Sequence, residues 1–531
     1  MKLKNYITFF VLVNFTALFG QDGTLDNTFS DDGIVTTAIG NGNDIAYSVA
    51  VQSDKKIIVA GASQDSTGQY DFTVVRYNNN GTLDNTFGNN GKITTDIKGK
   101  GATDYGYSVA IQKDDKIVLA GWTFNKNDFA VVRYNNNGTL DNTFGVNGKI
   151  ITNIGITDKG KAVAIQNDNK IVVAGYSYGG NTYDFAVVRY NTDGFPDKTF
   201  GSDGTVTTDI LSNKDYGMGI AIQPDNKIIV IGTAKDSSDN KLAVVRYNNN
   251  GALDATFNSN GKTSTLIENN SVIGNGADVV VQPDGKIVIA CTYGNGEYYK
   301  IAVVRFNSDG SLDNNWGNNG FVHSSISDYD DEAYSVALQS DGKILVGGYT
   351  TSSLGHNFAL LRYNSDGTLD STFDSDGIVT THLTSKWSFD DAYGMAIKND
   401  KIILCGRTDN GNNYDFGVVQ YNNNEKVSVE SNLLTEQNPE FNLLQNYPNP
   451  FNPSTTIRYS IPADVGKKQT LFVQLKVYNT LGQEVATLVN MQQQSGNYNI
   501  IFNASKLPSG AYFYRLTAGN FSRTKKFLLL K

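Results

Sequence analysis

The chain has 531 residues, with 44 Lys and Arg against 53 Asp and Glu, so its formal net charge is −9 and its pI is about 5.0. This acidic balance argues against a nucleic-acid-binding surface, which needs a basic face. The charge is unevenly spread, because the segment from Glu440 onward has a net charge of +7 and the rest has −16. The asymmetry predicts two domains with different roles.

The first twenty residues have the features of a signal peptide. Lys2 and Lys4 precede a mostly apolar run over residues 6–18, and Gly20 offers a small residue at a cleavage site. We therefore expect export and removal of residues 1–20. The run is too short for a membrane anchor and nothing like it follows, so we expect no transmembrane segment in the mature chain.

Residues 74–87 typify a stretch that recurs as far as Tyr421. Its closing aromatic residue returns after 58, 57, 56, 57, 59 and 57 residues. The seven positions are Phe29, Phe87, Phe144, Phe200, Phe257, Trp316 and Phe373. A near-constant period of this size is the signature of a repeat architecture.

Each repeat contains four short apolar runs, which in the first repeat span residues 46–52, 56–61, 71–77 and 83–95. The runs are rich in β-branched and aromatic residues and show no helical period. Turns such as Pro283-Asp284-Gly285 separate the first two runs and favour a hairpin. Four strands in each of seven units predict an all-β fold, a seven-bladed β-propeller.

An open β-solenoid is the alternative, and the two ends of the repeat region bear on the choice. The last repeat stops at Asn424 without its fourth run, and the segment that starts at Asp22 supplies the missing sequence up to Phe29. We therefore predict that the N-terminal strand completes the last blade and closes the ring, which removes two sheet edges.

The turn Asn79-Asn80-Gly81 places Arg76 opposite Asp84 if Gly81 adopts a left-handed conformation. Such a cross-strand ion pair contributes about 0.2–1 kcal/mol, at the low end of this range if it is exposed. The same eight-residue spacing between Arg and Asp recurs in six repeats. This repetition favours a role of the arginine in the scaffold over a role in anion binding.

These repeats resemble the delta-60 repeat family, secreted bacterial propellers, over residues 22–424. The resemblance rests on the Asp-Gly-Lys-Ile hairpins, the Val-Val-Arg-Tyr-Asn strand and the Leu-Asp-x-Thr-Phe-Gly strand. It implies the architecture and no particular chemistry.

After Asn424 the pattern stops. Residues 425–440 have the composition of a linker, and residues 441–531 predict a small Ig-like β-sandwich. The latter segment resembles the type A C-terminal sorting domain of the type IX secretion system. The matching pieces are residues 447–453, 477–485, 510–516 and 525–528. The resemblance implies that the type IX machinery is a partner, that the chain crosses the outer membrane and loses this domain, and that it is released or attached to the cell surface.

An acidic residue stands five positions before the apolar residue of the first strand in six repeats: Asp44, Asp104, Asp158, Asp215, Asp331 and Asp390. The functional interpretation is a ring of acids that binds a cation or a cationic ligand. The structural interpretation is loop capping, because Asp accepts hydrogen bonds from turn N–H groups. Near-perfect repetition favours the structural one.

Other candidates are specific to single repeats. Asp328, Asp330, Asp331 and Glu332 offer oxygen ligands for Ca²⁺ but lack EF-hand spacing, so calcium is compatible with them and not predicted, and no cofactor is expected. Among the loop aromatic residues, Trp122, Tyr178 and Trp387 are candidates for stacking on a ligand, with packing between blades as the alternative.

No placed Ser/His/Asp set or phosphate-binding loop emerges from the sequence. The preferred function is a secreted or surface-attached, non-enzymatic binding protein with an extracellular glycan or protein ligand. The alternative is an extracellular hydrolase or lyase acting on polysaccharide or peptide through acids of the ring.

Truncation after Glu440 tests the sorting assignment. The shortened chain should accumulate in the periplasm, because it lacks the segment that resembles a sorting domain. Immunoblots of periplasm and culture medium measure this, and normal secretion of the truncated chain would refute the assignment.

Overall fold

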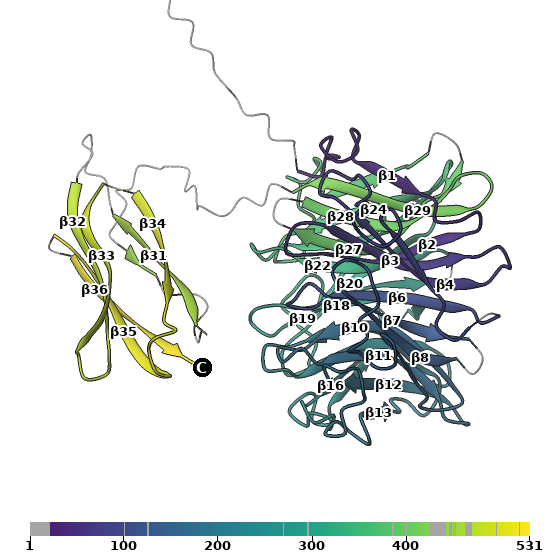
Figure 1. The fold of residues 1–531 in the computed structure, drawn as a ribbon, viewed down its shortest axis with the longest axis horizontal. Helices are drawn as coiled ribbons and strands as arrows, with labels where there is room; N and C mark the ends of the chain where they lie inside the picture. The colour runs from purple at the N-terminus through teal and green to yellow at the C-terminus, as the bar shows by residue number, and fades with distance from the viewer. Residues whose placement is uncertain are drawn as a thin grey trace, which may run out of the picture. The chain divides into compact units, whose positions relative to one another are not determined.

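The computed structural model divides the chain into two compact units, Met1–Val427 and Ser428–Lys531. It describes residues 22–99, 101–124, 127–268, 270–294, 297–384, 387–398, 401–423, 442–444, 446, 449, 451, 453–461, 470–494, 496–519 and 521–530. The predicted signal peptide (1–20) and linker (425–440) lie outside the described residues. All the named secondary-structure elements of the described residues are β-strands (Figure 1), and none of these residues belongs to a helix with the length and apolarity needed to cross a bilayer.

The first unit contains one sheet of four antiparallel strands for each repeat, and one of these sheets has an additional two-residue strand. The first strands are β2 (Asp44–Val51), β6 (Asp104–Ile111), β10 (Thr157–Ile165), β14 (Asp215–Ile222), β18 (Val272–Val281), β22 (Asp331–Leu338) and β27 (Asp391–Lys398). The second strands are β3 (Ile57–Gln64), β7 (Ile117–Thr123), β11 (Ile171–Tyr178), β15 (Ile228–Lys235), β19 (Ile287–Gly294), β23 (Ile344–Ser352) and β28 (Lys401–Asp409). The third strands are β4 (Tyr70–Tyr77), β8 (Asp128–Tyr134), β12 (Tyr183–Tyr190), β16 (Asn240–Tyr247), β20 (Tyr299–Phe306), β24 (Gly355–Tyr363) and β29 (Tyr414–Asn422). The outer strands are β5 (Lys92–Thr95), β9 (Lys149–Thr152), β13 (Thr205–Thr208), β17 (Lys262–Thr265), β21 (Phe321–Ser324), β25 (Ile378–Thr381) and β1 (Ile34–Thr37).

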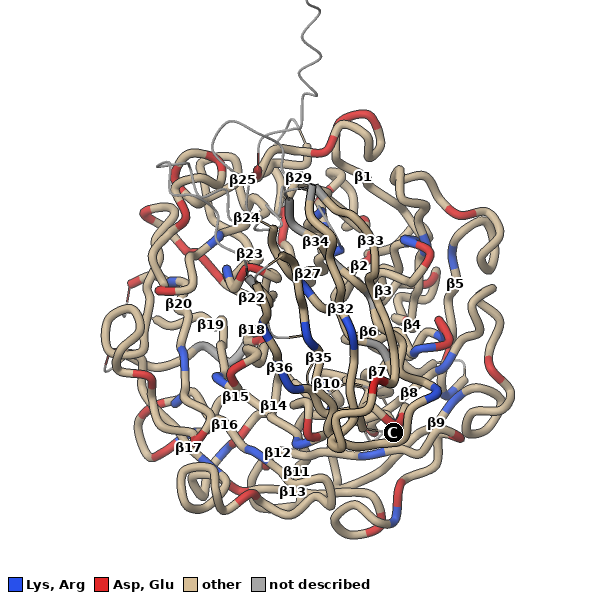
Figure 2. The backbone as a smooth tube through the Cα atoms, turned by 90° about the vertical axis from the view of Figure 1, so that its left-hand side faces the viewer, with Lys and Arg blue, Asp and Glu red and all other residues tan. Residues whose placement is uncertain are grey.

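The sheets pack face to face. The first strands of neighbouring sheets contact one another, and β27 also contacts β2. Figure 2 shows β5, β9, β13 and β17 at the outside of the unit. Apolar clusters join adjacent sheets, as where Val74 packs with Leu119 and Val132. Because both faces of each sheet are covered, the second and third strands are apolar along most of their length.

The connections separate two faces of this unit. Tight turns between first and second strands, such as residues 53–55, share the hairpin face with the turns that lead from third to outer strands. The longer loops, from second to third strand and from outer to first strand, form the looped face. The two-residue strand β26 (Ser388–Phe389) lies in one of these loops and pairs with β24.

The outer strands are shorter than the sequence predicts. Only residues 92–95 of the expected run 83–95 form a strand, and Leu83 makes a single bridge to Tyr77. The prediction fails because Asp84 accepts hydrogen bonds from the backbone and hydroxyl of Thr86, and Gly88 and Gly91 have positive φ, so turns replace the ladder. A short outer strand leaves little edge open for pairing with other chains.

The N-terminal segment joins the last sheet. β1 pairs with β29 from Ile34↔Val419 to Thr37↔Phe416, and Leu25 bridges to Tyr421. The expected completing strand at residues 22–29 therefore forms turns, as its equivalents do, and the paired strand is the one that follows it.

The predicted cross-strand ion pair is present in all six repeats, with the Arg Nε 2.7–2.9 Å from the Asp carboxylate. The pairs are Arg76–Asp84, Arg133–Asp141, Arg189–Asp197, Arg246–Asp254, Arg305–Asp313 and Arg362–Asp370. They are buried, so the expected energy of an exposed pair does not apply. Each guanidinium also lies over the closing aromatic ring, 4.4 Å away for Arg76 and Phe87.

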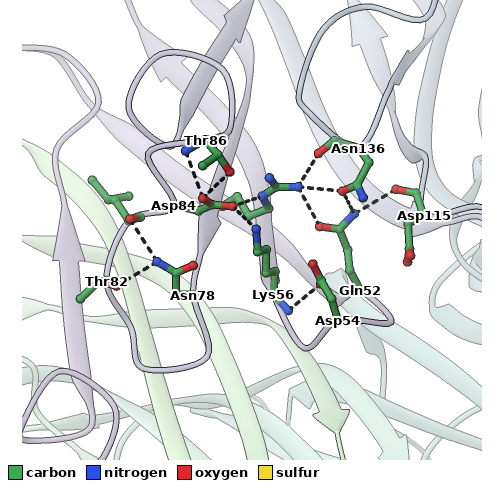
Figure 3. A network of polar contacts seen from close by, with 11 residues as sticks. Gln52, Asp54, Lys56, Asn78, Thr82, Asp84, Thr86, Asp115 and Asn136 are labelled. Atoms are coloured by element: carbon green, nitrogen blue, oxygen red, sulfur yellow. Dashed lines mark hydrogen bonds and ion pairs between the residues drawn. The ribbon is translucent and has the colours of Figure 1, made fainter.

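The ion pair also links neighbouring sheets. In Figure 3, Asp84 meets Lys56 at 2.7 Å, and Gln52 donates hydrogen bonds to the Asp115 carbonyl and the Asn136 side chain. Arg76 donates to the carbonyl and side-chain oxygens of the same asparagine, which lies in the next repeat. We call each such set of contacts an arginine latch.

The last sheet has a variant of the latch that uses both ends of the unit. Gln420 stands in the Arg position and donates a 2.7 Å hydrogen bond to Asp26, which also pairs with Lys401 at 3.0 Å. Arg362 of the preceding repeat donates to Asp22 at 2.9 Å. The N-terminal segment is therefore bonded to two sheets.

The second unit is a β-sandwich. One sheet contains β30 (Asn442–Leu443), β31 (Ser454–Ile461) and β34 (Gly496–Asn503). The other contains β33 (Glu484–Gln494), β32 (Thr470–Tyr478), β35 (Gly510–Ala518) and β36 (Phe521–Leu529). Both contribute to one core that includes Ile457, Val473, Tyr514 and Phe527.

Deletion of residues 22–37 should destabilise the last sheet more than the first, because it removes β1 and Asp26 together. Hydrogen exchange followed by mass spectrometry should show faster exchange in β29 than in β4, which keeps its outer strand. Equal acceleration in both strands would contradict the pairing.

The latches predict acid sensitivity. Burial by itself raises the pKa of Asp84, but hydrogen bonds from Lys56 and Thr86 and the charge of Arg76 outweigh it and hold the pKa below its ordinary value. Asp141, Asp197, Asp254 and Asp370 are shifted in the same direction.

A carboxyl whose folded pKa is depressed contributes stability above its unfolded pKa and loses it as the pH falls through the folded value. The urea midpoint of unfolding should therefore fall steeply below about pH 4, near the unfolded pKa of Asp. A midpoint that stays constant from pH 4 to pH 2 would rule out this contribution.

Candidate functional site

A β-bulge recurs in the first strands and turns one side chain out of each ladder. In β2 the register shifts between Ala46 and Ser48, which leaves Tyr47 unpaired. Gly61 lies opposite, where an added Cβ would come within 1.9 Å of the Ile45 carbonyl oxygen. Only glycine fits this close approach. The same shift in other sheets leaves Tyr107, Lys161, Met218, Tyr334 and Tyr393 at the bulge.

Four bulge tyrosines, Tyr334, Tyr393, Tyr47 and Tyr107, contact one another from sheet to sheet with ring centroids 4.9, 5.5 and 4.6 Å apart in that order. We call them the tyrosine belt. The ammonium of Lys161 lies 3.7 Å from the Tyr107 ring centroid, and burial lowers the pKa of Lys161 to about 8. Side chains therefore occupy the space between these first strands.

The predicted acids lie within one residue of the start of the first strands, and none is exposed to solvent. Each accepts a hydrogen bond of 2.6–2.9 Å from a backbone N–H of the preceding loop. The donors are Ile39, Ile97, Ile154, Ile210, Ile326 and Leu383, for Asp44, Asp104, Asp158, Asp215, Asp331 and Asp390 respectively. Each carboxylate thus fixes the loop that precedes it.

The four acids weighed as calcium ligands do not converge. Asp331 pairs with Lys300 at 2.9 Å, Asp330 accepts from the Tyr299 backbone, and Asp328 is exposed. Glu332 is bonded elsewhere, to Tyr334 and Tyr349. Among the described residues, acids that converge in threes are Asp71, Asp96 and Asp104, and Asp184, Asp209 and Asp215. Four of these six acids, Asp71, Asp96, Asp184 and Asp209, were not among the candidates predicted from the sequence.

The candidate aromatic residues differ in exposure. Trp122 is buried between Tyr105, 5.2 Å away, and the ammonium of Lys159. Tyr178 packs on Tyr183 at 5.1 Å. Trp387 is 59% exposed on the looped face, so it alone of the three presents most of its surface to solvent.

An aromatic ladder runs inward from Trp387. Its ring meets Phe389 edge-on at 4.6 Å, Phe389 meets His356 at 4.6 Å, and His356 stacks on Tyr349 at 4.4 Å. The contacts hold the exposed indole on a supported surface of β23, β24 and β26.

Two carboxylates lie beneath this ladder. Glu332 accepts from the hydroxyls of Tyr349 at 2.7 Å and Tyr334 at 2.8 Å. Asp391 contacts His356 Nδ1 at 2.6 Å and accepts from Arg407 Nε at 2.7 Å. Burial raises the pKa of Asp391, but His356 and Arg407 outweigh it and lower the pKa.

These two acids occupy a position that is Ile45, Tyr105, Lys159 and Tyr216 in other repeats. An acidic residue at a position that is apolar, aromatic or basic in other repeats is visible in the sequence, but the sequence analysis did not use it to single out Asp391.

Two family models match the chain. The family described as "Domain of unknown function (DUF5122) beta-propeller" matches residues 52–87, 112–144, 166–200, 223–257, 282–315 and 339–373. The one described as "Secretion system C-terminal sorting domain" matches residues 445–530. Both resemblances inferred from the sequence are confirmed.

The solved structures that match the chain are distant from it. The polysaccharide lyase Uly1 is 10% identical, with 71% of this chain and 90% of that chain covered and a TM-score of 0.45. Chaetomium thermophilum Sqt1, bound to the N-terminus of the ribosomal protein L10, is 10% identical, with 73% and 100% covered and a TM-score of 0.39. Trypanosoma rangeli sialidase in complex with the inhibitor DANA is 9% identical, with 92% and 85% covered and a TM-score of 0.37. At these scores none assigns an activity to this chain. A search of curated proteins found no significant match.

Proposed function

We propose that this chain is a non-enzymatic binding protein. It contains a DUF5122 β-propeller repeat domain and a secretion system C-terminal sorting domain, and it is exported by type IX secretion to the cell surface or the extracellular space. Its proposed scaffold is a seven-bladed propeller closed by the N-terminal strand. The proposed ligand is an extracellular glycan bound on the looped face.

The contacts at the ends of the repeat region support closure. β1 extends the sheet of β27, β28 and β29, and β27 contacts β2 of the first sheet. The family model matches six copies of the repeat, each of which is a single unbroken segment. The seventh copy is divided between residues near Asp26 and residues near Gln420. A divided copy would escape a contiguous match.

The burial and hydrogen bonding of the acidic side chains favour a binding protein over an enzyme. A glycosidase needs two free carboxyl groups about 5–9 Å apart across a cleft. All six predicted acids are buried and bonded to their own loops, and both Glu332 and Asp391 have each carboxylate oxygen in a polar contact. Groups held in this way suit a scaffold better than acid–base chemistry.

The looped face offers the binding surface. Large apolar or aromatic residues with more than half of their surface exposed lie on its loops, namely Phe124, Ile156, Tyr329, Leu354 and Trp387. Loops on a rigid scaffold are common sites of recognition. Trp387 is the best anchor for a sugar ring because it is large, planar and supported from below by Phe389.

Replacement of Trp387 by Ala should weaken ligand binding roughly tenfold or more, as truncation of an aromatic anchor does. The measurement is a glycan array with the secreted protein, followed by titration of the best ligand. Phe195→Ala is the matched control, because Phe195 is 48% exposed on the hairpin face.

Equal loss in both variants, or none in W387A, would refute this binding face. Binding of peptides and no glycans would leave the face in place and overturn the ligand class.

A further inference from the structure

Two lysines stand two residues apart on β10, near the looped face. Lys159 occupies the strand position that Glu332 and Asp391 hold in later repeats, and Lys161 is the residue that the β-bulge turns out of the ladder. Burial lowers the pKa of both, and the charge of Lys161 lowers that of Lys159 further. Both are half-buried, so solvent reaches them. We call these two residues the lysine pair.

Neither lysine has a counter-ion. Each ammonium lies over an aromatic ring, 4.3 Å from the Trp122 centroid for Lys159 and 3.7 Å from the Tyr107 centroid for Lys161. Within the part of the chain that the structure describes, no carboxylate forms an ion pair with either ammonium, and no acidic side chain contributes to the pKa shift of either lysine. Their positive charge is therefore uncompensated.

The acids closest to the lysine pair in sequence are engaged elsewhere. Asp158 accepts hydrogen bonds from Ile154 N and from Ser177 Oγ, both at 2.6 Å. Because successive side chains of a strand point to opposite faces, Asp158 and Lys159 diverge. Both oxygens of this acid serve the preceding loop and the neighbouring strand, so they do not neutralise the lysines.

Comparable cations elsewhere in this unit are paired. The Lys300 ammonium contacts Asp331 at 2.9 Å, and Arg407 Nε donates to Asp391 at 2.7 Å. The arginine of each latch likewise has its own aspartate. A charge withdrawn from water without a partner is costly. The lysine pair departs from this rule, as expected of a place where an anion from outside supplies the missing charge.

Aromatic rings lie on both sides of the lysine pair. In the preceding sheet, Tyr105 stacks on Trp122 with ring centroids 5.2 Å apart. Tyr176 is directly opposite Lys159 in the ladder, and its ring meets Tyr216 of the following sheet edge-on at 4.9 Å. The three tyrosines are half-buried, so part of each ring is open to solvent. Rings from three neighbouring sheets therefore accompany the two cations.

We propose that the lysine pair binds the anionic group, a carboxylate or a sulfate ester, of an acidic glycan. This site rests on the proposed function, because the lysines lie near the looped face to which we assign glycan binding. An ammonium forms strong, charge-assisted hydrogen bonds with such groups. The half-exposed rings offer apolar surface to the sugar, and a few polar groups among aromatic side chains are typical of a ligand site.

The unit around the lysine pair is negatively charged. Residues before Glu440 have a net charge of −16, so most of the surface repels a polyanion. The acids at the same strand position in later repeats, Glu332 and Asp391, are engaged by tyrosine hydroxyls, a histidine and an arginine. Attraction of polyanions to the whole unit is therefore not expected, and an acidic glycan should bind through the lysine pair.

Lys161→Met tests the proposal, because Met218 holds the same bulge position in the next repeat. Isothermal titration of the secreted protein with oligogalacturonate and with dextran sulfate measures the affinity. We expect a loss of roughly tenfold or more for the acidic ligand that binds, as for removal of a hydrogen bond to a charged group. The double variant K159M/K161M should lose more.

Each acidic ligand has a neutral counterpart with the same sugar ring, namely the methyl ester of oligogalacturonate and unmodified dextran. The parent protein should bind the neutral counterpart more weakly, and the lysine variants should not weaken that binding further. Oligogalacturonate binding alone identifies a carboxylate as the recognised group, and dextran sulfate binding alone identifies a sulfate ester. Equal affinity of the parent protein for acidic and neutral forms would overturn the proposal.

The lysine variants should fold at least as stably as the parent, since they remove buried charge that has no partner. Thermal unfolding followed by circular dichroism checks this. A role of the lysines in the scaffold would instead lower the midpoint and weaken binding of charged and neutral ligands alike, which would overturn the proposal.

Lys198→Met is the charge-matched control, because Lys198 is exposed on the hairpin face. It should leave binding unchanged, and a loss equal to that of K161M would reduce the effect to overall charge and overturn the proposal. Undiminished binding of acidic glycans by K159M/K161M, with a loss in W387A, would also overturn it but leave glycan binding in place. Binding of no glycan, acidic or neutral, would overturn the proposed function itself, and binding of an oligoglutamate peptide instead would overturn the glycan as the ligand.

Discussion

The arginine latch is the interaction on which the repeat architecture depends. A buried charge is costly unless it is fully paired, and removal of one partner is strongly destabilising. Arg76 meets this condition with donors that reach Asp84 in its own repeat and Asn136 in the next. The planar guanidinium fixes the direction of both contacts at once, which lysine could not do. Each latch therefore sets the turn inside one sheet and the position of the neighbouring sheet.

A second constraint operates at the other end of the strands. The first-strand bulge places a side chain such as Tyr47 toward its neighbours, and the buried acid that precedes it ties down the incoming loop. Both features recur with little change, so they belong to the scaffold. Differences between repeats are concentrated on the looped face, where Trp387 stands above Glu332 and Asp391 and where two of the acids gather carboxylates around them.

Much of the scaffold was predictable from the sequence because it is encoded locally. The strand pattern, the left-handed Gly81 and the opposition of Arg76 and Asp84 all follow from residues within one turn. The burial of that ion pair was not predictable, since it depends on a repeat some 60 residues away. The outer strand was overestimated because side-chain hydrogen bonds of Asp84 compete with the ladder.

The candidate sites were harder to predict for the same reason. Asp184, Asp209 and Asp215 come from three segments, and each looks like an ordinary turn acid in isolation. Alignment of the repeats against one another would have exposed Lys300 and Asp391 as departures from the pattern.

The bonding of β1 to β29 has a consequence for how the protein matures. The hydrogen bond from Gln420 to Asp26 spans 394 residues of sequence. A polypeptide that leaves a translocation channel amino end first must hold this strand without a partner until the final repeat has also emerged. Contacts of such long range form slowly. The last sheet can therefore be completed only after the whole repeat region has emerged, however early its amino-terminal strand is made.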